Sequence, residues 1–515
     1  MLYDVEKINN KNVFNYDVII IGAGASGIIC GNKINKINPK LRIAFIESGG
    51  LSNNKKINSI DTDYELNNKI DFKKSCARYL GGKTNLWSGR LVNIDNLELN
   101  KWPIKRKEIE FWRNEAMSIL ALGYSMEKLK RDSQKLIKGK FYKKLLGNSF
   151  NISPSLITNL KAFKLNYKNN KNLDLFIKAN AVKLNKESKS KKISHIDVIS
   201  SITKKKFTFK ANYVICCNGG LEVVKLLLHS GKDKSIGLAN SSGKLGLNFS
   251  AHPRGLEGII KLKNKINIYR TFLCSRKNIN NKLKIEFGIE LSNIKVKEYS
   301  VGKSRICFDP IITEYHSRFF YKFIKSNKLK RELLNKLGIK EKGFIIGLFS
   351  FLKIKLKRVF RLPIYTRYLA IRNYCASSLN EKSKVYLSKD KDFLGYEKLN
   401  IDWQISEEDK NSLVLSHKYL SKNISSEKIG FLKSEIKDGS NWKIWNGSSH
   451  FMSTTVMSES KEKGVVNTNC RTHDLENLYI CGPSIFPTPS SSNPMLFTTL
   501  LSLRLADHIV KLFKY

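Results

Sequence analysis

The chain has 515 residues, 41% of them hydrophobic, and its 92 Lys and Arg against 44 Asp and Glu give a formal net charge of +48. This length can bury a large core and predicts two or more domains. No apolar run is long enough to span a bilayer, which argues against an integral membrane protein with helical spans. The nine cysteines show no C-x-x-C spacing, so neither a disulfide framework nor a metal site is expected.

The excess of positive charge has two interpretations. A clustered basic surface would indicate a nucleic-acid or anionic-membrane partner. Here the lysines are spread along the whole chain beside many Asn and Ile, and Pro is limited to 10 residues. Lys, Asn and Ile share A/T-rich codons, so we prefer biased base composition as the explanation and expect no nucleic-acid partner. The first apolar run belongs to a strand and not to a signal peptide, so we expect a cytoplasmic protein.

The N-terminal region carries the strongest local pattern. An apolar run at residues 18–21 predicts a buried parallel strand. Gly22, Gly24 and Gly27 follow with G-x-G-x-x-G spacing, which allows a tight turn, close approach of a pyrophosphate and close packing of the next helix. A second predicted strand ends at Glu47, which can accept hydrogen bonds from an adenosine ribose. This pattern predicts a dinucleotide site, although by itself it does not separate FAD from NAD, and a glycine-tolerant turn in another α/β fold is the alternative.

A second glycine-rich segment and several further elements follow. Residues 78–90, RYLGGKTNLWSGR, make a poor helix and a poor strand, and they predict a loop folded against a flat ligand. An ordinary glycine turn with a core Trp is the alternative. Apolar spacing predicts a helix at residues 107–122, a strand at 172–184, a hairpin at 193–209 and a buried strand at 213–217.

The pattern changes between residues 258 and 445. Segments such as 282–291 and 383–387 predict antiparallel strands and a separate, mixed domain. A strand at 477–480 and a helix at 495–513 then return to the first domain. Asn493 and Pro494 precede this helix and suit its N-cap and first position.

One segment of the middle region is both apolar and basic. Residues 344–363, FIIGLFSFLKIKLKRVFRLP, begin with an apolar stretch and continue with five cations: Lys353, Lys355, Lys357, Arg358 and Arg361. A buried core helix followed by a solvated basic face, or a subunit contact, is the preferred interpretation. The alternative is an interfacial membrane segment on the inner membrane face, whose cations meet anionic lipid.

Six ordered motifs resemble the glucose–methanol–choline (GMC) oxidoreductases, a family of FAD enzymes that oxidise alcohols. The resemblance is close at both ends of the chain and loose in the middle. The motifs are the N-terminal glycine turn with Glu47, the loop 81–87, Ala181 and Val182 for the adenine, the segment 217–228, the loop 246–253 that ends in His252 and Pro253, and the C-terminal blocks 450–457, 464–467, 477–479, 486–488 and 493–494. Ser453 and Ser458 replace usual glycines, Lys83 replaces a small or apolar residue, and Pro483 replaces Ala or Gly.

The resemblance implies an α/β fold with a Rossmann-like FAD-binding domain and a mixed α+β substrate domain built on an antiparallel sheet. The FAD-binding domain would comprise residues 1–100, 172–258 and 446–515, and the helical insert and substrate domain residues 101–171 and 259–445. FAD would be non-covalent, because Leu86 stands where some relatives link the flavin through a His. The implied cofactor-binding residues are Gly22, Gly24, Ala25, Gly27, Glu47, Gly81, Gly82, Thr84, Asn85, Val182, Gly219, Gly482, Asn493 and Pro494.

His450 and Asn493 are the candidate catalytic residues. Oxidising a C–OH group removes a hydride from carbon, which the flavin accepts, and a proton from oxygen, for which an imidazole has a suitable pKa. The resemblance gives His450 the role of the base and Asn493 that of a hydrogen-bond donor to the same hydroxyl, while His252 is expected to be structural. A sugar or polyol is the favoured substrate. A lipid or terpenoid alcohol at the membrane surface and a non-catalytic flavoprotein are the alternatives, and the electron acceptor is left open.

Overall fold

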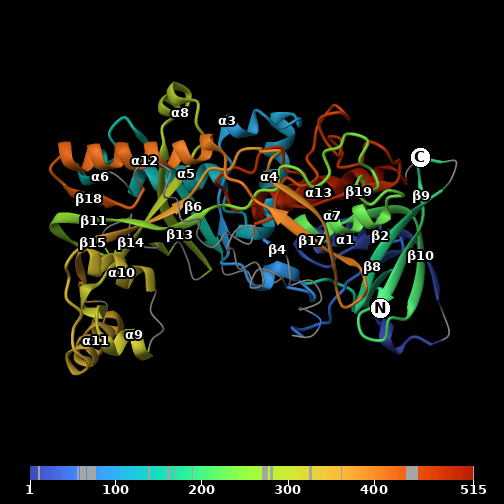
Figure 1. The fold of residues 1–515 in the computed structure, drawn as a ribbon, viewed down its shortest axis with the longest axis horizontal. Coiled ribbons are helices and arrows are strands. Elements are labelled where there is room, and N and C mark those ends of the chain that lie inside the picture. The colour runs from blue at the N-terminus through green and yellow to red at the C-terminus, as the bar shows by residue number, and fades with distance from the viewer. Residues whose placement is uncertain are drawn as a thin grey trace.

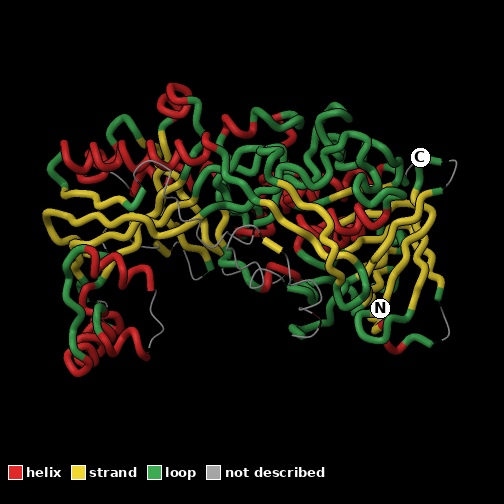
Figure 2. Tube along the Cα trace, in the orientation of Figure 1, coloured by secondary structure: helices red, strands yellow, loops and turns green. Residues whose placement is uncertain are grey.

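The computed structural model describes residues 1–9, 12–54, 57, 65–66, 77–136, 140–158, 163–168, 170–187, 190–269, 277–278, 282–323, 328–360, 362–436 and 450–513. Two large sheets lie at opposite ends of an elongated molecule, and both chain termini lie beside the first sheet (Figure 1). Helices cover the sheets, and long loops connect them near the middle (Figure 2). The described helices include none that is long and apolar enough to cross a bilayer.

The first sheet has eight strands among the described residues. Its order is β1 (Leu2–Asp4), β7 (Leu173–Ile177), β3 (Ile43–Ile46), β2 (Val13–Ile21), β10 (Lys206–Cys216), β9 (Ile193–Ser200) and β8 (Ala179–Lys186), with β19 (Leu478–Ile480) also paired to β10. The pairs from β1 to β10 and the β10–β19 pair are parallel, whereas β8, β9 and β10 are antiparallel. The central strands are buried on both faces, as their continuous apolar runs predict.

Helices cover this sheet and bring distant segments together. Helix α1 (Ala25–Ile37) packs on α13 (Met495–Lys511), α13 packs on α4 (Arg106–Ala121), and α7 (Gly219–Ser230) packs on β8. The predicted strand at 172–184 is two strands, β7 and β8, because Lys178 adopts a left-handed φ of 58° between them. Its backbone N–H donates to Gly49 O, so the turn is held by the first domain.

The second sheet is antiparallel throughout its described pairs. Its order is β18 (Gly430–Ser434), β11 (Arg254–Asn267), β15 (Tyr365–Tyr374), β14 (Arg305–Ile311), β13 (Leu283–Leu291), β6 (Phe150–Thr158) and β5 (Arg90–Leu91), with β12 (Lys277–Asn278) paired to β13. The predicted combination of a Rossmann-like domain and a domain on an antiparallel sheet is confirmed. A third, smaller sheet contains β16 (Lys384–Lys391), β17 (Glu397–Asp402) and β4 (Glu65–Leu66).

Two segments assigned from sequence to the substrate part of the chain lie against the first domain. Helix α4, in the expected helical insert, packs on α13, and strands β16 and β17 contact α7. The remaining described helices are α3 (Asn96–Leu99), α5 (Met126–Leu136), α6 (Lys140–Leu146), α8 (Asn293–Tyr299), α9 (Arg318–Phe323), α10 (Lys328–Lys336), α11 (Phe344–Val359) and α12 (Glu407–Ser426), with 3₁₀ turns η1 (Val5–Lys7), η3 (Gly82–Asn85), η5 (Thr313–Tyr315) and η6 (Pro483–Ile485).

Candidate active site

A side chain at Gly22 or Gly27 would clash with backbone atoms, and one at Gly24 would project into open space. Gly22 has a φ of 98°, and a Cβ on it would lie 2.8 Å from Cys217 O. A Cβ on Gly27 would lie 2.1 Å from Gly22 O, so this glycine lets α1 pack against the strand end. Nothing lies within 4 Å of a Cβ built on Gly24, which faces open space. The turn therefore presents bare backbone and the N-terminus of α1 to a cavity.

Glu47 joins the turn after β2 to the turn after β3. Its side chain is buried, with Oε2 accepting from Ala23 N and Oε1 accepting from Gly49 N, both at 2.9 Å. Each carboxylate oxygen has a further lone pair, and the residue lines the cavity. Glu47 therefore holds the two turns in place, and its carboxylate can still accept hydrogen bonds from a ligand.

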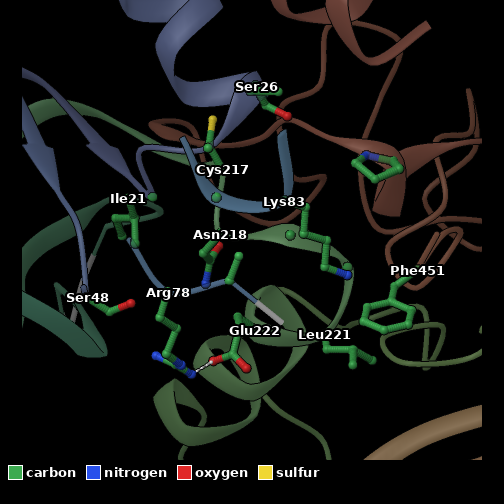
Figure 3. Close-up of a pocket in the computed structure, with 18 of the residues that line it drawn as sticks. Ile21, Ser26, Ser48, Arg78, Lys83, Cys217, Asn218, Leu221, Glu222 and Phe451 are labelled. Carbon is green, nitrogen blue, oxygen red and sulfur yellow. Dashed lines mark hydrogen bonds and ion pairs between the residues drawn. The ribbon is translucent and has the colours of Figure 1, made fainter. Parts of the chain in front are cut away.

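A cavity of about 550 Å³ runs along these turns (Figure 3). The predicted residues that line it are Gly22, Gly24, Ala25, Glu47, Gly82, Thr84, Val182, Gly219, His450, Asn493 and Pro494. Gly27, Gly81, Asn85 and Gly482 are not among its lining residues. Of these, Gly81 donates its N–H to Ala23 O, and the Asn85 amide donates to Leu80 O and Gly82 O, so both hold the second glycine loop together.

Two further positions expose groups that suit a dinucleotide. Val182 lies where the β8–β9 register shifts between Ala181 and Lys183, so it stands outside the regular ladder. Asn218, at the start of α7, has a buried Oδ1 with no hydrogen-bond partner among the described residues. A Cβ on neighbouring Gly219 would meet nothing within 4 Å. Unfilled space beside an orphaned polar atom is what a bound cofactor would complete, so the residues present fit FAD.

Sequence reasoning missed several charged groups in the cavity. Arg78 and Glu222 form an ion pair at 2.8 Å, and Lys83 extends over the Phe451 ring, 3.3 Å from its centroid (Figure 3). Arg254 also lines the cavity. Lys83 was identified only as a departure from the family pattern. Arg78, Glu222 and Arg254 have no sequence motif that indicates a site, because only the tertiary fold brings them together.

A chain of hydrogen bonds joins His450 to its surroundings. Nε2 of His252 lies 3.4 Å from Pro489 O, which can only accept, so Nε2 carries the proton. Nδ1 of His252 must then accept from Nδ1–H of His450, 3.1 Å away. Nε2 of His450 is left with a lone pair, toward which Nδ2 of Asn493 points from 3.4 Å. His252, expected to be structural, therefore sets the tautomer of the candidate base.

The electrostatic environment keeps His450 neutral. Burial lowers its pKa well below the usual range, and the nearby His252, Arg254, Lys83 and Arg90 lower it further. Burial also lowers the pKa of His252 to about 4. A neutral imidazole with a lone pair on Nε2 can accept a proton, and the surrounding cations favour negative charge on a group bound beside it.

Asn493 does not cap α13, contrary to the sequence prediction. Pro494 is the N-cap, without a side-chain capping bond, and Thr498 N donates to Pro494 O at 2.8 Å. The Asn493 amide is directed to His450 instead. Ser453, which replaces a family glycine, has a left-handed φ of 61°, and its Oγ donates to Phe486 O at 2.9 Å. The loop thus keeps the glycine-like conformation, with the hydroxyl bond as compensation.

Residues 380–502 match the family model for GMC oxidoreductase. The C-terminal part of the chain is therefore similar to the GMC oxidoreductases. The matched region ends within α13 and includes both His450 and Asn493. The resemblance drawn from the motifs is confirmed over this C-terminal region.

Several solved structures share the fold over nearly the whole chain. Pyridoxine 4-oxidase from Mesorbium loti is 12% identical with a TM-score of 0.55, and the match covers 96% of this chain and 99% of that one. A variant of Aspergillus oryzae RIB40 formate oxidase, studied for FAD modification, is 14% identical with a TM-score of 0.58, covering 98% and 99%. Another formate oxidase structure is 14% identical with a TM-score of 0.57, and the match covers 98% of this chain and 99% of that one. No curated protein matches the chain.

Proposed function

We propose that this GMC-type chain binds FAD non-covalently and oxidises a CH–OH group, with His450 as the base. The observation that carries the proposal is that Nε2 of His450 and Nδ2 of Asn493, 3.4 Å apart, point toward each other in the wall of the cavity. One group is an acceptor and the other a donor. A substrate hydroxyl that replaces this contact would donate to Nε2 of His450 and accept from Nδ2 of Asn493, which would fix its orientation.

Residues along the cavity would hold the cofactor, which supplies the hydride acceptor. The Gly24 turn and the N-terminus of α1 suit a pyrophosphate, Glu47 suits a ribose, and the backbone at Val182 suits an adenine. The loop around Gly82 and Thr84 would lie along the flavin ring system. The N-terminus of α13 faces the same cavity through Pro494 and Met495, and its helix dipole favours negative charge there.

A sugar or polyol is the proposed substrate, since hydroxyl groups beyond the reacting one would find donors in Lys83 and Arg254. A small-molecule lipid or terpenoid alcohol is a second candidate. One observation favours it: helix α11 exposes a row of large apolar side chains on the molecular surface. A non-catalytic flavoprotein is the remaining alternative, and no alcohol would reduce its flavin.

The test is anaerobic reduction of the FAD-loaded protein by a panel of sugars, polyols and lipid alcohols, followed by flavin absorbance. With the best substrate, His450→Ala should retain FAD and slow reduction by roughly 10²–10⁴-fold, the usual contribution of a positioned base. Asn493→Ala should slow it less. His195→Ala, on β9 away from the cavity, serves as the matched control and should react at the parent rate. Parent-like reduction by both site variants would refute the assignment.

A further inference from the structure

Helices α9, α10 and α11 form a unit on one face of the second sheet, opposite α12 (Figure 1). The unit is attached by two small apolar clusters. Leu334 of α10 packs with Leu256 and Ile311, and Ile354 of α11 packs with Ile312 and Ile364. Helix α11 therefore has one face anchored to the body of the protein.

Close packing fixes which face of α11 is turned inward. Gly347 is buried, and a Cβ on it would lie 2.5 Å from the Ser317 side chain at the start of α9. Phe351 contacts the Phe319 ring, with centroids 5.7 Å apart. Gly347, Phe351 and Ile354 recur at helical spacing, so the opposite side of α11 is necessarily turned away from the protein.

That opposite side is a continuous apolar row. Ile345, Phe349, Leu352, Leu356 and Val359 are spaced by steps of four and three and lie on one helix face. Their exposure ranges from 46% to 73%. The preferred expectation of a buried core helix is therefore wrong for this surface. A row of large exposed side chains of this kind indicates a binding surface.

Cations border the apolar row on both sides. Helical periodicity places Lys353 and Lys357 along one edge and Lys355 along the other. Residues 344–359 contain no Asp or Glu. Among the described residues, no carboxylate forms an ion pair with these lysines or with Arg358, which lies over the Tyr315 ring at 5.5 Å. Arg361, the fifth cation of the segment, lies outside the described residues.

We propose that this face of α11, defined by Ile345, Phe349, Leu352, Leu356 and Val359 with the flanking lysines, docks on an anionic lipid surface. An apolar row bordered by lysines without a carboxylate partner among the described residues is the arrangement of an interfacial helix, in which the apolar side chains enter the headgroup boundary and the lysines reach the lipid charges. Steps of four and three would also suit pairing with a second copy. Two such faces would bring six lysines together with no acid on either helix, which disfavours that contact.

The test uses the full-length, FAD-loaded protein and flotation with vesicles of phosphatidylcholine and phosphatidylserine in equal parts. The parent should float at low salt, float less at high salt, and fail to float with phosphatidylcholine alone. Replacing Lys353 and Lys357 by Gln should weaken binding roughly 10-fold or more. Replacing Lys418 and Lys422 by Gln, an exposed pair with the same spacing on α12 across the sheet, should leave binding unchanged.

A second variant separates lipid docking from simple charge attraction. Ile345→Ser with Phe349→Ser keeps every cation and should also weaken flotation about 10-fold or more. All variants should retain FAD and the parent melting temperature, because the altered side chains are exposed. Failure of the parent to float at low salt would overturn the proposal. The proposal would also be overturned if flotation were absent and light scattering showed a concentration-dependent dimer that the serine variant abolishes.

Discussion

At the scale of single residues, the decisive feature is the contact between two histidines. His450 is described by its motif, but the motif says nothing of which ring nitrogen carries the proton. The contact from His252, itself held by the Pro489 carbonyl, leaves Nε2 of His450 as the acceptor. The lone pair that the proposed base needs is therefore on the nitrogen beside Asn493.

Replacing His252 tests this positioning role. His252→Leu removes the acceptor for Nδ1–H of His450 and should slow flavin reduction about 10–100-fold while FAD stays bound. His252 also lowers the pKa of His450, so its loss should raise that pKa and shift the acid limb of the rate to higher pH. The parent rate should stay flat as pH falls through 6.5. His252→Asn, which retains an acceptor, should recover part of the rate, and an unchanged pH profile in the leucine variant would exclude the role.

Leu86 decides the expected mode of flavin attachment. The residue lines the cavity and is 52% exposed, and its side chain cannot form a bond to the flavin. Acid precipitation of the yellow protein should therefore release all of the flavin into the supernatant, measured by absorbance. Colour that stays with the pellet after washing would show that another residue attaches the cofactor.

At the scale of elements, a buried ion network ties the second glycine loop to the second sheet. Arg90 of β5 donates to Glu286 of β13 at 2.7 and 2.9 Å, and Arg372 of β15 lies 3.3 Å from the same carboxylate. Burial opposes ionisation of Glu286, but the hydrogen bonds and charges of the arginines lower its pKa to about 2. The cavity wall at Arg90 is thus fixed by strands of the second domain.

Glu286→Ala should destabilise the protein by about 3–5 kcal/mol, because it leaves the buried Arg90 guanidinium without its carboxylate partner, while Arg372 keeps Asp309 at 3.0 Å. Since the folded pKa is depressed, the stabilisation by Glu286 is present above pH 4.5 and is lost as pH falls toward 2. The measurement is the melting temperature at neutral pH, with Glu286→Gln as a milder variant. Glu298→Ala, on the exposed helix α8, is the control and should melt like the parent. Equal melting temperatures of the parent and both Glu286 variants would contradict the argument.

At the scale of the whole molecule, the formal net charge of +48 lowers the stability of the folded state. Like charges on a folded surface repel one another, and salt screens this repulsion over roughly 10 Å at 0.1 M. We expect the melting temperature to rise as NaCl increases from roughly 0.05 to 0.5 M. A matched series with sucrose, which adds no ions, separates screening from solute exclusion. A melting temperature that falls with salt would show that attractive ion pairs outweigh the net repulsion.

Local chemistry was enough to predict the glycine turn, the central strands and the helix α13. Gly22, Gly24 and Gly27 have roles set by the absence of Cβ, and apolar runs such as that of β2 can be buried only between covering layers. These features depend on neighbours in sequence, which is why the fold class and the family resemblance could be read without coordinates. The positions of His450 and Asn493 followed from motifs of the same kind.

Only the tertiary structure decided how these residues meet and which face of each element is covered. Asn493 looked like a helix cap by local rules, yet the fold turns its amide to His450, 43 residues away in sequence. His252 carried no local sign of its contact with the same ring. Residues 344–359 predicted a helix but not its orientation, since a core and an interface have the same apolar periodicity. Packing of Gly347 and Ile354 inward settles that question, because it leaves Ile345 and Phe349 on the outside.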